Sequence, residues 1–121
     1  MTENNRPLSP HLQVYKLPLT GIISITHRMT GVVLALGLMF YVYSFYCILQ
    51  GNESYLALQA FLNNTLVSIA VWFFIYALFF HLCHGIRHLI WDVGTSFNKE
   101  DMDRNAIIEL AMSFVLTLIF Y

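Results

Sequence analysis

Three histidines and an arginine stand close together in one apolar stretch of the sequence, at His81, His84, Arg87 and His88. At 100° per residue of an α-helix, the three histidines fall within about 60° of one another and form a stripe on one face. Gly85 lies on the same side, and its missing side chain would let a flat cofactor or another helix approach closely. Ionisable residues inside a membrane-spanning helix are costly, and they suggest a functional site.

Depth in the membrane separates the three histidines. If the membrane surface lies near Trp91 and Asp92, His88 is at the boundary and His81 lies about 15 Å inward from that surface, at a rise of 1.5 Å per residue. A neutral imidazole at that depth is suited to be an axial ligand of haem iron, and the alternative is a core histidine that hydrogen-bonds a neighbouring helix. For His84 and His88 the alternatives are contact with a haem propionate and simple contact with water at the boundary.

A second cluster of polar and small residues precedes the first long apolar run, at Gly21, Ser24, His27, Arg28 and Gly31. Ser24 and Arg28 are four residues apart, so they face the same way on a helix. A hydroxyl and a guanidinium near the interface could bind a quinone carbonyl or a haem propionate, because arginine pairs with carboxylates through two hydrogen bonds. The alternative is an interface arginine whose charged end simply reaches water.

The composition indicates that both clusters lie on membrane-spanning helices. Hydrophobic residues make up 58% of the 121 residues and charged residues only 11%, against roughly 45–50% and about 25% in a soluble domain. A water-soluble fold is therefore excluded, and no nucleic-acid partner is expected. We predict an all-α integral membrane protein with a single membrane-anchor domain over residues 1–121. It comprises a surface segment over residues 1–18 and transmembrane helices over about 19–50, 66–90 and 104–121.

The lengths of the uncharged runs support these three helices. Residues 29–52 contain no Asp, Glu, Lys or Arg, and neither do residues 54–86; Glu53 separates the two runs. Each run exceeds the roughly 20 residues that a spanning helix needs. Residues 51–64 are expected to form a loop. The third run, 106–121, is 16 residues long and rises only about 24 Å. Its one charge, Glu109, is expected in the first turn, where it would cap the helix.

All the lysines and arginines are predicted to lie on one side of the membrane. Three stand before or at the start of the first helix and three flank the second loop: Arg6, Lys16, Arg28, Arg87, Lys99 and Arg104. The positive-inside rule assigns that side to the cytoplasm or the mitochondrial matrix. The N-terminus is therefore expected inside and the C-terminus outside.

Three motifs in this order resemble the cytochrome b large membrane-anchor subunits of succinate dehydrogenase, the succinate–ubiquinone oxidoreductase of respiratory complex II. They are RPLSPHLQVY over residues 6–15, SITHRMTG over residues 24–31, and HLCHGIRHLIWD over residues 81–92. The resemblance implies an inner-membrane anchor, bacterial or mitochondrial, with no dehydrogenase activity of its own. Its implied partners are a flavoprotein subunit, an iron–sulfur subunit, a small membrane-anchor subunit and ubiquinone.

The resemblance also implies roles for individual residues. His81 would be an axial ligand of haem b, which is shared with the small anchor subunit. His27, Arg28 and His88 would contact the haem propionates, and Ser24 and Arg28 would bind the quinone. His84 receives no role. Two alternatives stay open: a structural anchor without haem, and a b-type cytochrome subunit of another membrane dehydrogenase.

Overall fold

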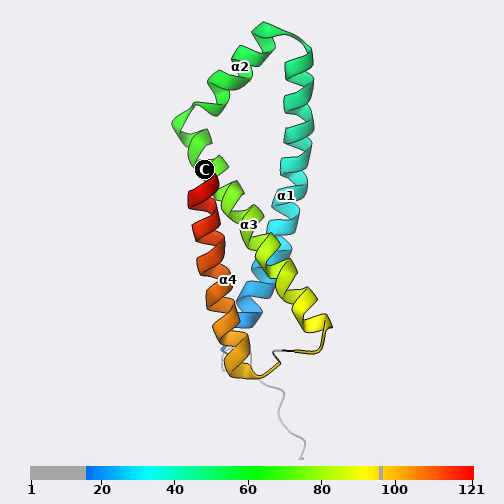
Figure 1. Ribbon diagram of the computed structural model, residues 1–121. Coiled ribbons are helices and arrows are strands. Elements are labelled where there is room, and N and C mark those ends of the chain that lie inside the picture. The colour runs from blue at the N-terminus through cyan, green and yellow to red at the C-terminus, as the bar shows by residue number, and fades with distance from the viewer. Residues whose placement is uncertain (1–15, 96) are drawn as a thin grey trace, which may run out of the picture.

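The computed structural model describes residues 16–95 and 97–121, and over that part the chain is entirely helical (Figure 1). Its elements are α1 (Leu19–Leu49), α2 (Asn52–Leu62), α3 (Thr65–Asp92) and α4 (Lys99–Phe120). The all-α prediction is confirmed for these residues. Most of the predicted surface segment 1–18 lies outside the described residues, and the single-domain organisation stays a prediction.

The two long apolar runs form the two longest helices. Among the described residues, α1 and α3 are the helices long and apolar enough to cross a membrane. They begin and end within two residues of the predicted limits 19–50 and 66–90. Asn64 caps α3, because its side-chain oxygen accepts a hydrogen bond from the Leu66 N–H at 3.0 Å, which satisfies one of the free donors at a helix start.

The prediction of a loop over residues 51–64 is wrong, because α2 occupies most of that segment. Gly51 adopts φ +107° and separates α1 from α2, a backbone conformation that glycine adopts without steric cost. The following residues are mainly Glu, Leu, Ala and Gln, which have high helix propensity. Glu53 lies in the first turn of α2, where the helix dipole stabilises a carboxylate. Figure 1 shows α2 bridging the ends of α1 and α3.

The predicted start of the third helix at residue 104 is also wrong. α4 begins at Lys99 and is 22 residues long, so it rises about 33 Å. The charges that suggested a loop include Glu100 and Asp101 in the first turn, where acidic side chains are favourable. The helix is therefore not short, and Glu109 lies almost three turns after its start instead of in the first turn.

α1, α3 and α4 pack together in the half of the molecule away from α2 (Figure 1). Their common core consists of Ile23 on α1, Phe80 on α3 and Ala106 on α4, with Tyr76 and Leu110 packed against it. This core is small. It fixes the level at which the N-terminal part of α1 meets the C-terminal part of α3.

Small residues let the helices approach closely. A Cβ atom on Gly37 of α1 would overlap the ring of Phe74 on α3, so this crossing requires glycine. On α4, the buried positions Ala106, Ser113 and Thr117 face α3 together with Glu109. The Ser113 and Thr117 hydroxyls donate to the backbone carbonyls four residues earlier, so both of these buried hydroxyls are satisfied within α4. Small residues at helix contacts are typical of membrane proteins.

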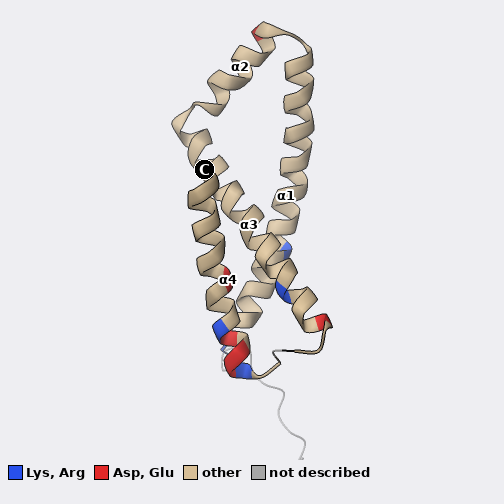
Figure 2. Ribbon diagram, in the orientation of Figure 1, with Lys and Arg blue, Asp and Glu red and all other residues tan. Residues whose placement is uncertain are grey.

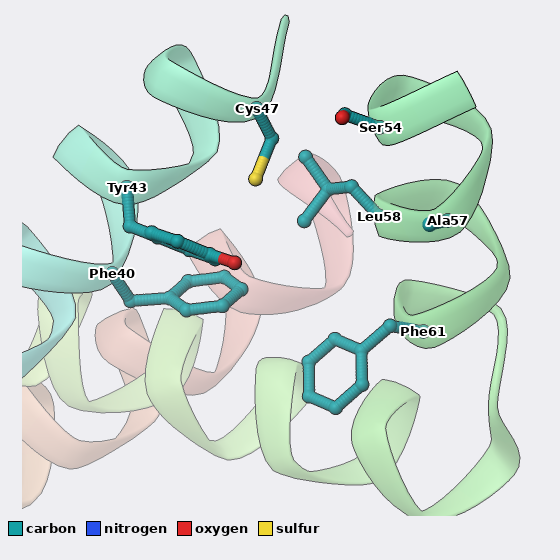
Figure 3. A pocket seen from close by; sticks show the side chains of 7 residues that line it. All are labelled: Phe40, Tyr43, Cys47, Ser54, Ala57, Leu58 and Phe61. Carbon is teal, nitrogen blue, oxygen red and sulfur yellow. The ribbon is translucent and has the colours of Figure 1, made fainter. Parts of the chain in front are cut away.

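Most other large apolar side chains are exposed in the isolated chain, including Met39, Leu49, Leu66 and Phe120. An exposed apolar surface this extensive exceeds what a monomer in water carries, and it marks contact with lipid or with partner chains. A cavity of about 420 Å³ opens between the end of α1 and α2 (Figure 3). Its lining consists of Phe40, Tyr43, Cys47, Ser54, Ala57, Leu58 and Phe61.

Candidate functional site

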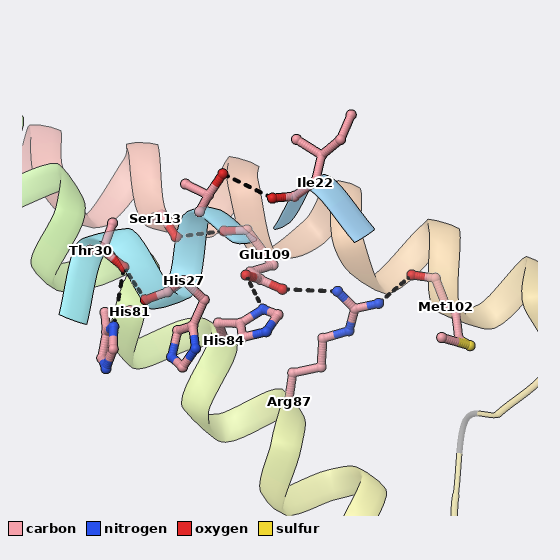
Figure 4. Close-up of polar contacts among 10 residues, drawn as sticks. Ile22, His27, Thr30, His81, His84, Arg87, Met102, Glu109 and Ser113 are labelled. Carbon is pink, nitrogen blue, oxygen red and sulfur yellow. Dashed lines mark hydrogen bonds and ion pairs between the residues drawn. The ribbon is translucent and has the colours of Figure 1, made fainter. Parts of the chain in front are cut away.

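Four histidine rings gather where α1 crosses α3. The ring of His27 on α1 stacks on His81 with centroids 4.0 Å apart, and lies 4.4 Å from His84 and 5.8 Å from His88. Figure 4 shows His27 between His81 and His84. The sequence placed the two clusters at a similar depth. The structure brings them into direct contact next to the core of Ile23, Phe80 and Ala106, in which Ile23 is one turn before His27 and Phe80 one turn before His84.

His81 is oriented by a hydroxyl on the neighbouring helix. Thr30 Oγ1 donates to the carbonyl of His27 at 2.8 Å and lies 3.1 Å from His81 Nδ1 (Figure 4). Since the single hydroxyl proton goes to the carbonyl, the oxygen accepts from His81 Nδ1–H. The neutral ring then keeps its lone pair on Nε2, on the side away from Thr30. Histidines that bind a metal commonly have their second nitrogen fixed in this way.

Gly31 makes room for the His81 ring. A Cβ atom on Gly31 would lie 3.3 Å from His81 Cε1, which is tighter than an ordinary contact. Gly85 was predicted to allow a close approach, and no described protein atom lies within 4 Å of a Cβ placed there. The space beside Gly85 is thus open, and within this chain the close approach of the two helices occurs at Gly31.

A buried polar triad connects α3 to α4. His84 Nδ1 lies 2.8 Å from Glu109 Oε1, and Arg87 Nη1 donates to Glu109 Oε2 at 3.1 Å (Figure 4). All three residues are buried: His84 is 1% exposed, Glu109 5% and Arg87 4%. The predicted capping role of Glu109 is wrong, since the carboxylate is an ion-pair partner inside the helix bundle. For His84 the alternative of simple contact with water is wrong, because the side chain is buried in the bundle.

Arg87 makes two further contacts that hold it in place. Its Nη2 donates to the carbonyl of Met102 at 2.7 Å, and its guanidinium lies 4.6 Å from the centre of the Trp91 ring. The pairing of Arg87 with Glu109 was not predicted from the sequence. The available signal was that Glu109 is the one charge in the third apolar run, so a buried opposite charge was needed elsewhere.

Ser24 and Arg28 lie apart from these contacts. Ser24 is half-buried and Arg28 is exposed, and neither side chain makes a hydrogen bond or an ion pair within the described part of the chain. They are one helical turn apart on α1 and so face the same way. Their polar groups are therefore available to a ligand or to another chain.

His88 is exposed at the edge of the histidine group. Its ring lies 4.7 Å from His84 and 5.0 Å from Trp91. Ring nitrogens of His27, His84 and His88 all lie within 4.8 Å of one another. Within the described residues, Nε2 of His27 and Nε2 of His84 are buried and have no hydrogen-bond partner. Buried polar atoms are nearly always satisfied, so these two nitrogens indicate a place where another group binds.

Comparison with known proteins agrees with this description. The sequence model of the succinate dehydrogenase/fumarate reductase transmembrane subunit family matches residues 2–120. The chain is 38% identical over 128 residues to the succinate dehydrogenase cytochrome b560 subunit of Reclinomonas americana, covering 95% of this chain and 83% of the relative. It is 37% identical over 119 residues to the cytochrome b556 subunit of Rickettsia felis, covering 98% and 92%. The mitochondrial cytochrome b560 subunit of Sus scrofa is 36% identical over 113 residues, covering 91% and 66%. The resemblance found in the sequence motifs is thus confirmed, and the chain belongs to the family of cytochrome b transmembrane subunits of succinate dehydrogenase.

Proposed function

We propose that this chain is the haem b-binding membrane anchor of a succinate–ubiquinone oxidoreductase, where it helps to form the ubiquinone site. It passes electrons from succinate oxidation to quinone and has no dehydrogenase activity of its own. The observation that carries the proposal is the orientation of His81, whose Nδ1 is held by Thr30 in a chain that matches the family over almost its full length.

The donor set of this site fits haem b. His81 Nε2 carries the lone pair that an axial ligand requires, and the open space beside Gly85 leaves room for a flat group. When bound, haem b supplies a one-electron redox centre. The second axial ligand is assigned to the small anchor subunit, with which the haem is shared. His27, Arg28 and His88 are assigned to the propionates, because they lie on the inner side of His81 along α1 and α3.

Ser24 and Arg28 are assigned to the quinone. A serine hydroxyl donates one hydrogen bond to a quinone oxygen, and a guanidinium adds donors and a positive charge. Neither group is engaged by another described residue, so neither has to break a contact to bind a ligand. Both lie in the first turns of α1, near the level at which an iron–sulfur subunit on the inner surface would deliver electrons.

The membrane arrangement that supports this role has three spans. α4 runs antiparallel to α3 over most of its length, since Arg87 bonds the carbonyl of Met102 at one end and Tyr121 bonds the carbonyl of Ser68 at the other. The part of α4 after its charged first turns, residues 105–120, rises about 24 Å, most of a hydrocarbon core of about 30 Å. We therefore assign α4 as the third span, with the N-terminus inside and the C-terminus outside.

The charges and the apolar surface agree with that placement. In Figure 2 the described lysines and arginines lie in the half of the molecule away from α2, whereas Glu53 lies in the first turn of α2. This asymmetry places the positive half on the inner side of a bacterial cytoplasmic membrane or a mitochondrial inner membrane. The exposed apolar faces would contact lipid and the small anchor subunit, and the inner end would meet the flavoprotein and iron–sulfur subunits.

The test is a reduced-minus-oxidised spectrum of the purified complex, with copurifying subunits identified. We expect a haem b signal together with a flavoprotein and an iron–sulfur protein. In His81→Ala the signal should disappear, and in Cys83→Ala, two residues away on α3, it should stay. A complex with succinate activity but no haem would identify a haem-free anchor instead. Copurification of a different dehydrogenase would overturn the assignment of the enzyme.

A further inference from the structure

We propose that His27, His84 and His88 form a site for a divalent metal ion of the zinc type, with Glu109 as the carboxylate partner of His84. The site goes beyond the proposed function. It depends on His84 and Glu109, which have no part in haem or quinone binding, although it shares His27 and His88 with the proposed propionate contacts.

His84 is held with one ring nitrogen free to bind a metal ion. Its Nδ1 lies 2.8 Å from Glu109 Oε1, and the other oxygen of that carboxylate accepts from Arg87. A carboxylate paired with a guanidinium accepts hydrogen bonds, so His84 donates Nδ1–H and keeps the lone pair on Nε2. That Nε2 is buried with no hydrogen-bond partner within the described residues. A carboxylate that fixes one imidazole nitrogen while the other faces a metal is a recurrent arrangement in zinc sites.

Three histidine rings converge at this place. Ring nitrogens of His27, His84 and His88 lie within 4.8 Å of one another. Around zinc they would stand about 3.3 Å apart, given Zn–N distances of about 2.0–2.1 Å and tetrahedral angles. His84 is fixed by Glu109, whereas His88 is exposed and can turn toward it. The exposed side also leaves a fourth position open to water.

The site is distinct from the axial position of His81. His81 Nδ1 is engaged by Thr30, and its ring lies on the far side of His27 from His84. A metal ion bound by the other three rings therefore does not need His81. A purely structural role for the triad would require only His84, Arg87 and Glu109, and it would make no use of His88. A variant of His88 therefore distinguishes the metal site from a purely structural triad.

The experiment is equilibrium dialysis of the purified complex against Zn²⁺, with bound zinc measured by atomic absorption. We expect wild type to bind one more zinc ion per complex than His84→Asn or His88→Asn. Glu109→Gln should weaken binding of that ion by roughly 10–100-fold, the usual effect of losing a carboxylate that supports a ligand. Glu100→Gln, which removes an exposed carboxylate from the first turn of α4, should bind zinc like wild type.

His88→Asn is the deciding variant, because it removes an exposed ring and leaves the buried triad intact. Flavin content verifies assembly of each complex. Equal zinc binding by wild type and His88→Asn overturns the metal site. The haem spectrum of the same preparations keeps the two proposals separate: haem without the additional zinc overturns only the metal site, and zinc without haem overturns only the haem assignment.

Discussion

His84 on α3 and Glu109 on α4 lie 2.8 Å apart in the interior of the helix bundle, 25 residues apart in sequence. Arg87, one turn after His84, holds the second oxygen of the same carboxylate. The three side chains fix the rotation of α4 against α3, because any other rotation would bury Glu109 without a partner. The face of α3 that carries the histidines is thereby set toward α1.

Breaking this triad is expected to destabilise the anchor. Glu109→Leu leaves Arg87 buried without its ion-pair partner, which typically costs about 3–5 kcal/mol. We expect a clear fall in the midpoint of thermal unfolding and a lower yield of assembled complex, followed by circular dichroism and flavin content. The double variant Arg87→Leu/Glu109→Leu should recover part of the loss, since no uncompensated charge remains.

The surface pair Arg104–Asp101 serves as the control for that prediction. Its atoms also lie 2.8 Å apart, but the arginine side chain is 67% exposed. Exposed pairs contribute about 0–1 kcal/mol, so Asp101→Asn should leave the unfolding midpoint almost unchanged. A comparable loss in Asp101→Asn and Glu109→Leu would contradict the assignment of α4 docking to the buried triad.

Thr30→Val is expected to weaken haem binding without removing it. The substitution keeps the shape of the side chain but deletes the oxygen that accepts from His81 Nδ1–H. Loss of such a supporting contact typically reduces metal affinity by about 10–100-fold. The measurements are the haem content and the midpoint potential of the purified complex. Thr26→Val, which removes an exposed hydroxyl bonded only to the Ile22 carbonyl, should match wild type in both.

Ser24→Ala and Arg28→Leu are expected to slow quinone reduction selectively. The serine variant loses one neutral hydrogen bond, worth about 0.5–1.5 kcal/mol, so quinone binding should weaken by up to roughly tenfold. The arginine variant loses a charge and should be affected more. Quinone reductase and dye reductase rates in the same membranes separate the effects. An equal fall in both rates indicates an assembly defect, and unchanged quinone reduction in both variants would overturn the quinone assignment.

Gly37→Ala is expected to disturb the crossing of α1 and α3. The added Cβ would overlap the ring of Phe74, and overpacking of this kind usually costs about 1–3 kcal/mol. Thermal unfolding of the complex measures the effect. In Gly21→Ala the new Cβ would lie 3.4 Å from the nearest Leu17 atom, an ordinary contact, so this variant should unfold like wild type. Equal stability of all three proteins would mean that the crossing adjusts without cost.

The orientation of the chain can be tested with tags. A tag after Tyr121 should be accessible from the outer side of the membrane and a tag at Met1 from the inner side, because the lysines and arginines are concentrated in one half of the molecule. Protease protection in sealed vesicles of known orientation provides the measurement. Accessibility of both ends from the same side would show that α4 does not cross.

The sequence by itself determined the two long helices and their limits. Uncharged runs of this length have one stable form in hydrocarbon, in which every backbone group bonds within the helix, so α1 and α3 were predicted to within two residues. It also determined the family, through SITHRMTG and HLCHGIRHLIWD. α2 was missed and the start of α4 was misplaced, because a break at Gly51 and a group of charges before residue 104 are compatible with either a loop or a helix end.

Only the tertiary structure decided which polar side chains meet. Periodicity places His84 and Arg87 on α3, and Glu109 on a neighbouring helix, but it does not give the rotation of one helix against another. That rotation follows from the packing of Ile23, Phe80 and Ala106 and from the close approach at Gly37. It brings His27 against His81, Thr30 against the same ring, and Glu109 between His84 and Arg87. These contacts join residues 22 to 54 positions apart, and no local pattern in the sequence specifies such pairs.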